Sequence, residues 1–509
     1  MTDPVAVDGR SLSLDAFLAV ARGARPVALA PGALERVRAS RAQVERAVRA
    51  GRPVYGVTTG FGALSTVTIP EAKVRELQSS LVRSHASGTG PPLPPDLARG
   101  LVLLRLNSLA AGLSGVRPEV LEALAGVLNH GLVPWIPQQG SVGASGDLAP
   151  LAHLALALTG EGAFRDGTGD GRIAAAETLA RAGIRPLVLE AKEGVGLVNG
   201  TALMTSYLAL GVADARALLE AAVVAAGMSV DALLGSPQSF DDRLGAARNA
   251  PDERAVAASL RALLAGSQLA ASRSEWAGQD PYTLRCLPQV LGASRLAVRW
   301  AEEVVGRELN AVTDNPLVLA PDDFVSGGNF HGQSLAFALD ALALGVQYVA
   351  GFAERRVSRL VHPALNRGLP AFLAPEPGVS NGFMIPQYVA AALVNENATL
   401  VHPASASSLP TSADQEDYVS MGAWAGAKLA RVIENARKVV AIEWLVAGAA
   451  LDRRRPRTGG SGSEAALRAL HARVRPWEAD RSPADDIDRV ARAIASGELV
   501  AEVRSAVPY

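Results

Sequence analysis

The sequence predicts an all-α protein built around a bundle of long helices, and three observations support this fold class. Alanine, leucine and arginine are abundant, and aromatic residues make up only 5% of the composition. Long segments keep apolar residues at helical spacing with few glycine or proline residues between them. Signals for β-strands are sparse along the chain. We therefore expect helices to form most of the structure.

Two segments, 334–361 and 422–454, carry the longest helical patterns. Each exceeds the average helix length of about 11 to 12 residues, and much of its circumference is apolar. A helix of this kind needs partners on several sides, which indicates the core of a bundle or a subunit interface. Residues 160–177 contain Asp-Gly turns and predict a small hairpin followed by a helix. Residues 453–464 predict an exposed, flexible connection.

The charge balance and the single cysteine restrict the function classes. The 509 residues carry a formal net charge of −1, which provides no attraction to nucleic acid or to an anionic membrane. Cys286 alone can form neither an intrachain disulfide nor a cysteine-based metal site. The N-terminal segment lacks the features of a secretion signal, and no apolar stretch approaches the ~18 to 20 residues of a membrane span. We therefore expect a soluble, cytoplasmic protein without a cysteine-based metal site.

The stretch 140–158 begins GSVGASGD and places small residues directly before an apolar helical pattern. Asp147 is expected to cap the free amides of that helix, and Pro150 is tolerated in its first turn. The small residues then lie at the positive end of the helix dipole, where negative charge is stabilised. This arrangement is compatible with a phosphate-binding loop, a serine hydrolase elbow or a covalent rearrangement of the chain.

The spacing of this stretch argues against the first two of these chemistries. A phosphate-binding loop requires GxGxxG or GxxxxGK[ST], whereas these glycines fall at 140, 143 and 146. A hydrolase elbow requires glycine two residues on each side of Ser145, but Asp147 takes one of these places. In the third chemistry the Gly146 nitrogen attacks the Ala144 carbonyl carbon and two waters are lost. The product is a five-membered ring with an electrophilic methylidene group, although small residues before a helix also occur in tight backbone crossings.

The stretch GSVGASGDLAPLAH resembles the cofactor-forming signature of the aromatic amino acid ammonia-lyases, which build 4-methylidene-imidazol-5-one (MIO) from Ala-Ser-Gly. Other stretches are similar to the family's motifs in the family's order: YGVTTGFG (55–62), EGVGLVNGTAL (193–203), QDPYTLRCLPQVLGA (279–293), NAVTDNPL (310–317), SGGNFHGQ (326–333) and LPTSADQEDYVSM (409–421). The resemblance implies a helical bundle of the ammonia-lyase and fumarase–aspartase type. It implies an N-terminal region, 1–200, with the tyrosine loop and the MIO-forming triad, and a helical region, 201–509. It also implies a homotetramer with active sites shared between subunits.

Removal of ammonia from an α-amino acid requires an electrophile for the nitrogen, a base for the weakly acidic β-hydrogen and a clamp for the carboxylate. By resemblance, Ala144, Ser145 and Gly146 supply the electrophile, Tyr55 is the base, and Arg285 binds the carboxylate through two hydrogen bonds. The resemblance places further residues around the substrate or the MIO: Asn199, Gln279, Tyr282, Asn315 and Phe330. On local sequence alone, Tyr55 also fits the boundary between a loop and the core, and Asn315 also fits a turn before a proline.

Two positions indicate the substrate. Ser84-His85 is similar to the histidine-specific branch of the family, and Glu416 is similar to a carboxylate that this branch places near the imidazole, where it would orient the ring or transfer a proton. Bound phenyl would leave His85 and Glu416 unpaired in a buried site. The resemblance therefore implies conversion of L-histidine to trans-urocanate and ammonia with no external cofactor. Three residues near these motifs depart from those usual in histidine-specific members, namely Leu287, Asp414 and Tyr418.

Other functions stay open at this point. A phenylalanine or tyrosine ammonia-lyase, or an aminomutase, would use the same MIO. A lyase dependent on pyridoxal phosphate would need a Schiff-base lysine, and none of the four lysines, Lys73, Lys192, Lys428 and Lys438, has a recognisable setting for that role. A helical scaffold without chemistry would have no use for an intact Tyr55, triad and Arg285.

Overall fold

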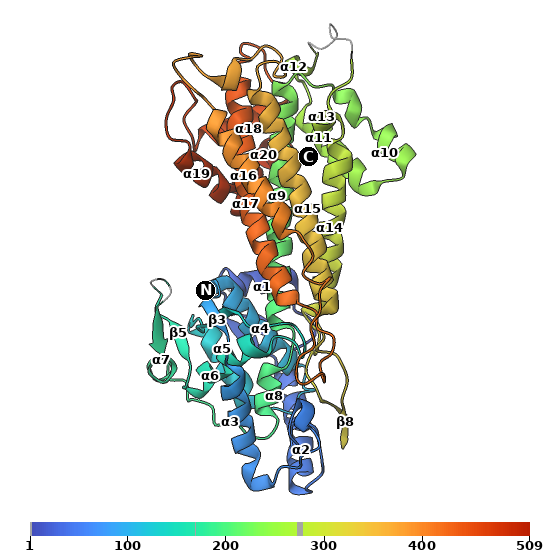
Figure 1. Cartoon of the computed structure of the whole chain (residues 1–509), viewed down its shortest axis with the longest axis vertical. Helices are drawn as coiled ribbons and strands as arrows, with labels where there is room; N and C mark the ends of the chain where they lie inside the picture. Colours follow the sequence, from blue (N-terminus) through green and yellow to red (C-terminus); the bar gives the residue numbers. More distant parts are fainter. Residues whose placement is uncertain (1–2, 168, 170, 272–277) are drawn as a thin grey trace. The chain divides into compact units, whose positions relative to one another are not determined.

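The computed structural model describes residues 3–167, 169, 171–271 and 278–509 (Figure 1). Within this range most residues are helical, and the few strands form four two-stranded sheets. The expected all-α class is therefore confirmed.

The helices are α1 (Leu14–Ala21), α2 (Pro31–Arg49), α3 (Val74–His85), α4 (Pro95–Ala110), α5 (Pro118–Asn129), α6 (Leu148–Thr159), α7 (Ala175–Arg181), α8 (Glu193–Val198), α9 (Ala202–Ala232), α10 (Asp242–Arg248), α11 (Pro251–Leu263), α12 (Gln268–Ala271), α13 (Tyr282–Arg285), α14 (Leu287–Glu308), α15 (Gln333–Val361), α16 (Met384–Leu400), α17 (Gly422–Asp452), α18 (Ser461–His471), α19 (Ala484–Ala495) and α20 (Glu498–Ala506). The paired strands are β1 (Val5–Val7) with β2 (Val27–Leu29), β3 (Thr89–Pro92) with β4 (Pro137–Gln139), β5 (Ala163–Arg165) with β6 (Arg172–Ala174), and β7 (Leu317–Ala320) with β8 (Asp323–Val325). The first pair is parallel and the other three are antiparallel.

The chain forms two compact units. The first comprises residues 1–210, 302–339 and 403–427, and the second comprises residues 211–301, 340–402 and 428–509. The boundary after residue 200 that the resemblance implies stays a prediction.

In the first unit, α4 lies between α1 and α5, and its residues from Leu97 to Ala110 are almost all buried. The helices α3, α6 and α8 also pack against one another. This second group matters for function, because His85 ends α3 and the glycine-rich loop leads into α6.

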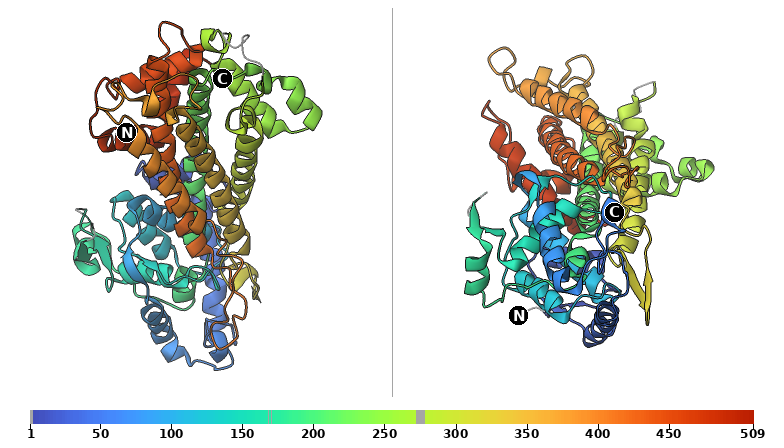
Figure 2. Two further views of the ribbon diagram at one scale, coloured as in Figure 1. Left: turned by 45° about the horizontal axis from the view of Figure 1, so that its top comes forward. Right: turned by 60° about the horizontal axis from the view of Figure 1, so that its bottom comes forward.

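In the second unit, long helical segments run side by side as a bundle (Figures 1 and 2). The part of α17 from residue 439 to residue 451 is fully buried, and Trp444 donates a hydrogen bond of 3.0 Å from its indole to the carbonyl oxygen of Ala221. A helix that is apolar all round is stable only when other helices surround it. The predicted long helices at 334–361 and 422–454 are confirmed as α15 and α17.

The hairpin expected within 160–177 is also confirmed. The strands β5 and β6 pair in antiparallel register, with Ala163 opposite Ala174, and α7 follows directly. The other strand pairs were not predicted, because each strand has only three or four residues.

The expected exposed connection at 453–464 is confirmed only in part, because residues 453–460 form neither helix nor strand and residues 455–457 are exposed, whereas the rest is helical, half-buried or buried. The helix α18 begins at Ser461, and the preceding Gly459 and Gly460 are buried. Arg454 explains why a run of arginines is ordered here. Its guanidinium donates hydrogen bonds of 2.8 to 3.1 Å to three backbone carbonyls, those of Ala232, Asn366 and Arg367.

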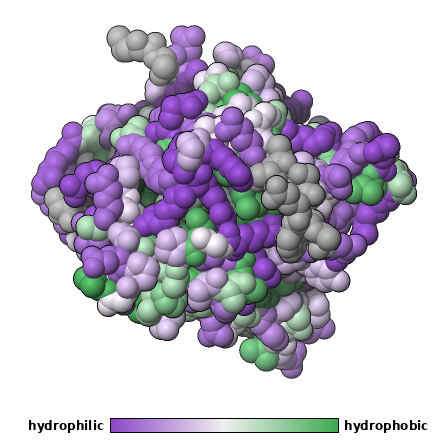
Figure 3. Space-filling model, turned by 90° about the horizontal axis from the view of Figure 1, so that it is seen from above, coloured by the Kyte–Doolittle hydropathy of each residue, from purple (hydrophilic) through white to green (hydrophobic). Residues whose placement is uncertain are grey.

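The expectation that no apolar segment reaches the length of a membrane span is wrong for one helix. Among the helices in the described part of the chain, α15 alone is long and apolar enough, with a mean hydropathy of 1.6 over its most apolar 18 residues. However, 61% of this stretch is buried inside the protein, as in the core helix of a bundle. On the face seen from above the view of Figure 1, hydrophilic side chains predominate and apolar ones are scattered (Figure 3).

Candidate functional site

The glycine-rich loop before α6 folds into a tight turn around Ser145. The φ angles of Gly143 and Gly146 are +64° and +77°, in the left-handed region that favours glycine. Ala144 and Gly146 form a backbone bridge across Ser145. A Cβ atom on Gly146 would lie 2.2 Å from the carbonyl oxygen of Gly200, so this close approach excludes any larger residue.

The prediction that Asp147 caps α6 is wrong, because its side chain makes no capping hydrogen bond with that helix. Its carboxylate instead accepts hydrogen bonds from the backbone amides of Leu203 and Met204 at 2.8 and 3.1 Å, and from the hydroxyl of Ser141 at 2.9 Å. The two amides belong to the first turn of α9, whose positive end therefore receives the carboxylate. Complete burial raises the pKa of Asp147 to about 6, against the lowering effect of these hydrogen bonds.

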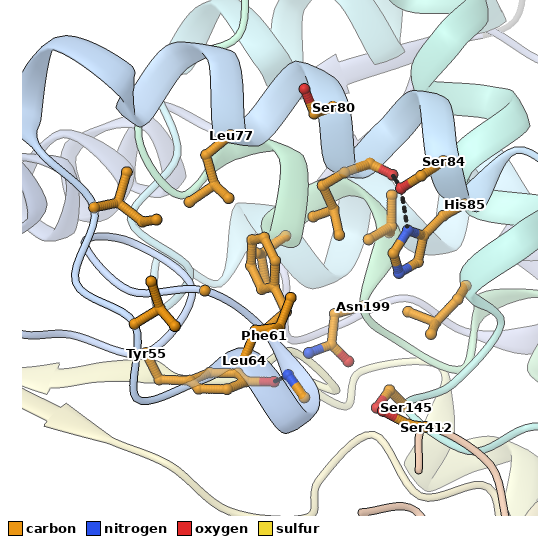
Figure 4. A pocket seen from close by; sticks show the side chains of 18 of the residues that line it. Tyr55, Phe61, Leu64, Leu77, Ser80, Ser84, His85, Ser145, Asn199 and Ser412 are labelled. Atoms are coloured by element: carbon orange, nitrogen blue, oxygen red, sulfur yellow. Dashed lines mark hydrogen bonds between the residues drawn. The ribbon is translucent and has the colours of Figure 1, made fainter.

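A cavity of about 600 Å³ opens beside Ser145 within the first unit (Figure 4). Its polar groups come from distant segments: Tyr55 from a turn-rich loop, His85 from the end of α3, Asn199 from the end of α8 and Glu416 from the segment before α17. The rest of the lining is largely apolar and includes Phe61, Leu64, Val67, Ile69, Leu77, Leu81, Leu148, Val195 and Val198.

A second cavity of about 460 Å³ shares part of this lining. Tyr55, Ser145 and Glu416 line both cavities, so they lie where the two meet. The second cavity also has Ala144, Asn315 and Phe330 in its wall. Side chains from the predicted motifs at 55–62, 140–158, 310–317, 326–333 and 409–421 thus converge around Ser145.

Glu416 is held at both of its oxygens. The hydroxyl of Ser145 donates to Glu416 Oε1 at 2.6 Å, and the hydroxyl of Thr411 donates to Glu416 Oε2 at 2.8 Å. Sequence reasoning missed Thr411, although it lies in the same motif as Glu416. The turn between them has left-handed φ angles at three consecutive residues other than glycine, Ser412, Ala413 and Asp414. Such a backbone is costly and is typical of functional sites.

Tyr55 and His85 are both half-buried at the first cavity. The Tyr55 hydroxyl accepts a hydrogen bond of 3.1 Å from the backbone amide of Gly62, and the Tyr55 ring meets that of Phe61 edge to face. His85 Nδ1 lies 3.0 Å from the hydroxyl of Ser84. Burial lowers the pKa of His85, although Glu416 acts in the opposite direction. The imidazole is therefore neutral near pH 7 and offers a ring nitrogen to a ligand.

Asn199 is buried beside Ser145, with its side-chain amide turned toward the cavity (Figure 4). Asn199 Nδ2 donates to the carbonyl oxygen of Asn315 at 3.2 Å, whereas Asn199 Oδ1 accepts no hydrogen bond from any described residue. A buried amide oxygen without a donor is unfavourable and indicates a missing ligand group or water.

Three of the predicted residues are not among the residues that line these two cavities. Gln279, Tyr282 and Arg285 lie in the second unit and line neither cavity. The Tyr282 side chain is 67% exposed, and the Arg285 guanidinium lies over its ring at 4.8 Å. Among the described residues, no group of three or more histidine, cysteine, aspartate or glutamate side chains could hold a metal ion.

Comparison with known proteins places these observations in context. The profile of a family described as aromatic amino acid lyase matches residues 12–475. A histidine ammonia-lyase from Symbiobacterium thermophilum is 49% identical over 499 residues, which cover 98% of each chain. Among solved structures, a tyrosine aminomutase from Streptomyces globisporus has a TM-score of 0.93 at 37% identity and covers 100% of this chain and 99% of that one. A histidine ammonia-lyase from Trypanosoma cruzi has a TM-score of 0.91 at 39% identity, with 99% and 96% covered.

Proposed function

Because the chain belongs to the aromatic amino acid lyase family, we propose that it converts L-histidine to trans-urocanate and ammonia. One observation carries the choice of substrate: His85 and Glu416 line the same cavity as Ser145. A neutral imidazole and a carboxylate are matched hydrogen-bonding partners for the two nitrogens of a histidine ring.

We propose MIO, formed from Ala144, Ser145 and Gly146, as the cofactor, with no external cofactor. Three features fit this group: the bridge across Ser145, the absence of space for a Cβ on Gly146, and the unpaired oxygen of Asn199 beside the loop in the described structure. When formed, MIO supplies an electrophile for the amino group of the substrate.

The residues of the chain then have separate tasks. Tyr55 removes the β-proton, and it lies where the two cavities meet. His85 and Glu416 orient the imidazole in the first cavity, and Glu416 also stands ready to exchange a proton. Asn315 and Phe330 border the amino acid portion of the substrate in the second cavity. Asn199 faces the substrate and the MIO with its side-chain amide.

We assign the carboxylate clamp to a neighbouring copy of the chain. Arg285, with Tyr282 and Gln279, lines neither cavity of its own chain, yet a carboxylate needs a cationic partner of this type. A homotetramer with shared active sites supplies these residues from another subunit. We place this assembly in the cytoplasm, without a nucleic acid or membrane partner, because the net charge is only −1.

A second candidate is a tyrosine or phenylalanine ammonia-lyase, or an aminomutase, that uses the same MIO. The largely apolar lining of the first cavity favours it, since Leu77, Leu81 and Val198 would contact a phenyl ring without loss. The solved tyrosine aminomutase noted above has the same fold.

The deciding experiment offers the purified protein L-histidine, L-tyrosine and L-phenylalanine separately, without added cofactor. The ultraviolet absorbance of the unsaturated acids identifies each product. Urocanate from histidine alone supports the proposal, whereas coumarate or cinnamate would favour the second candidate. In the same sample, a mass deficit of two water molecules in the peptide containing residues 144–146 tests the MIO.

A further inference from the structure

We propose that Lys192, Asp314 and Arg105 are positioning residues that hold Asn199 and Asn315 beside the Ser145 loop. None of the three was expected at the site from the sequence, where Lys192 was weighed only as a Schiff-base lysine. They lie in the first unit, behind the cavity wall rather than in it. The kinetic part of this inference rests on the proposed function.

Lys192 and Asp314 form an ion pair that is sealed from solvent. Lys192 Nζ donates to Asp314 Oδ2 at 2.6 Å, and both side chains have 0% exposure. Removing two charges from water is unfavourable, and their mutual attraction at best offsets this cost. The backbone of Lys192 is also strained, with a φ of +74°. A pair that combines burial with strain contributes little to stability by itself, which points to a role in placing neighbouring groups.

The other oxygen of the Asp314 carboxylate connects the ion pair to Asn315 at the site. Asp314 Oδ1 accepts a hydrogen bond of 2.7 Å from the backbone amide of Asn315. The carbonyl oxygen of Asn315 accepts the hydrogen bond from Asn199 Nδ2, and Asn315 Oδ1 accepts another at 2.8 Å from the amide of Gly327. Displacement of Asp314 would therefore move both asparagines.

Arg105 holds Asn199 from the other side. Its side chain is buried, and Nη1 donates to the carbonyl oxygen of Asn199 at 2.6 Å. Nε and Nη2 have no hydrogen-bond partner within the described part of the chain. A buried guanidinium with unpaired donors is unfavourable for folding. This unfavourable arrangement has a purpose if Arg105 is needed to hold the carbonyl group of Asn199 in place.

The network also touches the reactive loop. Gly200 follows Asn199, and its carbonyl oxygen accepts a hydrogen bond of 2.7 Å from the amide of Asp147, one residue after Gly146. A Cβ on Gly200 would lie 2.5 Å from Arg105 Nη1. The Asn199-Gly200 segment is thus clamped between Arg105 and the loop, which leaves Asn199 Oδ1 in the cavity without a donor among described residues.

The second unit provides a matched control for the ion pair. Arg356 and Glu443 are likewise 0% exposed, with Arg356 Nε 2.5 Å from Glu443 Oε1. This pair lines neither cavity. Loss of either pair leaves an uncompensated buried charge and destabilises the fold. Only loss of the first pair should alter the chemistry.

The test compares three single variants, Lys192→Met, Asp314→Asn and Arg356→Met. Lys192→Met and Asp314→Asn are each also combined with Asn199→Ala as double variants. Thermal unfolding is measured first, then the fraction of subunits with the two-water mass deficit, and finally kcat and KM per subunit that has it. We expect Lys192→Met to lower kcat/KM for histidine by about 10- to 100-fold, as loss of an orienting partner does at other sites. With Asn199 already replaced, the further loss should stay below about threefold, because coupled residues are not additive.

Arg356→Met should lower the unfolding temperature but leave kcat/KM per matured subunit within about twofold of the unaltered enzyme. The proposal would be overturned if Lys192→Met lowered kcat/KM by the same factor in the unaltered enzyme and in Asn199→Ala. It would also be overturned if Lys192→Met left kcat/KM unchanged. Should Lys192→Met fail to fold, Asp314→Asn decides by the same comparison, since the neutral amide removes the ion pair with Lys192 from the other side.

An unaltered enzyme that makes no urocanate would refute the proposed function rather than the network. The network would then be tested by measuring kcat/KM with the amino acid that is turned over. If none is turned over, the test is the fraction of subunits with the two-water mass deficit. The matured fraction must fall in Lys192→Met and not in Arg356→Met, because only the first pair supports the segment against the loop.

Discussion

Two stretches rich in glycine and serine, 140–147 and 458–464, each lead into a helix, one in each unit. Each is fastened by a buried aspartate. Asp147 binds the amides that begin α9, and Asp231 accepts hydrogen bonds from the amide of Gly460 at 2.8 Å and the hydroxyl of Ser267 at 2.6 Å. Burial raises the pKa of each of these carboxyls to about 6.

The two stretches differ in what their glycines do. In the first, Gly143 and Gly146 have left-handed φ angles that turn the chain back and leave Ser145 at a cavity. In the second, Gly460 has an ordinary backbone and serves close packing, since a Cβ there would lie 2.4 Å from the carbonyl oxygen of Leu263. The comparison teaches that small residues alone do not indicate a reactive site. The site requires the left-handed turn and a side chain that faces open space.

The largest expected effect comes from replacing one serine in each stretch. Ser145→Ala removes the hydroxyl that MIO formation must expel, so we expect turnover of histidine to fall by roughly 10³-fold or more. Ser461→Ala, at an exposed position that begins α18, should stay within about twofold of the unaltered enzyme. Urocanate absorbance and peptide mass are the measurements. Sustained turnover by Ser145→Ala would refute the proposed chemistry.

Alanine at one glycine of each stretch should separate conformation from packing. Both new methyl groups meet a backbone oxygen, and only Gly146 has a left-handed φ. We expect Gly146→Ala to lower the free energy of unfolding by about 2 to 5 kcal/mol and Gly460→Ala by about 1 to 3 kcal/mol. Urea unfolding measures these losses. The mass deficit should disappear in Gly146→Ala alone, and its disappearance in both variants would contradict the distinction.

The carboxylates beside the two stretches offer a third comparison. Glu416 binds Ser145 and lines both cavities, whereas Glu464 binds Arg455 at 2.7 Å and the amide of Gly459 at 2.8 Å. We expect Glu416→Gln to reduce kcat/KM for histidine by about 10²-fold, because the amide can neither accept a proton nor pair with a charged imidazole. Glu464→Gln should cost about 1 kcal/mol of stability with unchanged kinetics. Similar kinetics for the two variants would place Glu416 outside the chemistry.

The last comparison concerns the pH dependence of stability. The ordinary pKa of an aspartate is 3.8, and in the folded protein that of Asp231 is about 6, so the folded state binds more protons between these values. The contribution of this carboxyl to stability therefore falls as pH rises from about 4 to 6, by about 1.4 kcal/mol for each pH unit, and is constant outside that window.

The corresponding measurement is urea unfolding at pH 7, 5.5 and 4 for the unaltered protein and Asp231→Asn. The unaltered protein should gain stability relative to Asp231→Asn as pH falls from 7 to 4. A difference that does not vary with pH would show that Asp231 has an ordinary pKa. The same sign is expected for Asp147, whose pKa is raised by the same cause.

The helices were predictable where their sequence pattern is regular. Residues 334–361 and 422–454 repeat apolar side chains over many turns, and they form α15 and α17. The hairpin of β5 and β6 was predictable from its Asp-Gly turns. The ordered structure at 453–464 was not, because Arg454 is fixed by carbonyl groups that lie 87 to 222 residues away in sequence.

The site was predictable only through resemblance. No local pattern links Tyr55, His85 and Glu416, which come together because three distant segments surround one cavity. The partner of Asp147 was missed for a related reason, since the amides that it satisfies begin a helix 56 residues further along the chain. The pairing of Lys192 with Asp314 was not predicted, because burial and pairing leave no mark on the surrounding sequence.

The hydrogen bond between Ser145 and Glu416 joins residues 271 positions apart. At a synthesis rate of about 5 to 20 residues per second, Glu416 leaves the ribosome some tens of seconds after Ser145. Tyr55, His85 and the triad are therefore present in the nascent chain long before the segment at 403–427 completes the cavity. A chain that stalls before residue 403 contains the Ala-Ser-Gly sequence but only part of its enclosure. The cavity beside Ser145 therefore cannot close before the segment 403–427 has been synthesised.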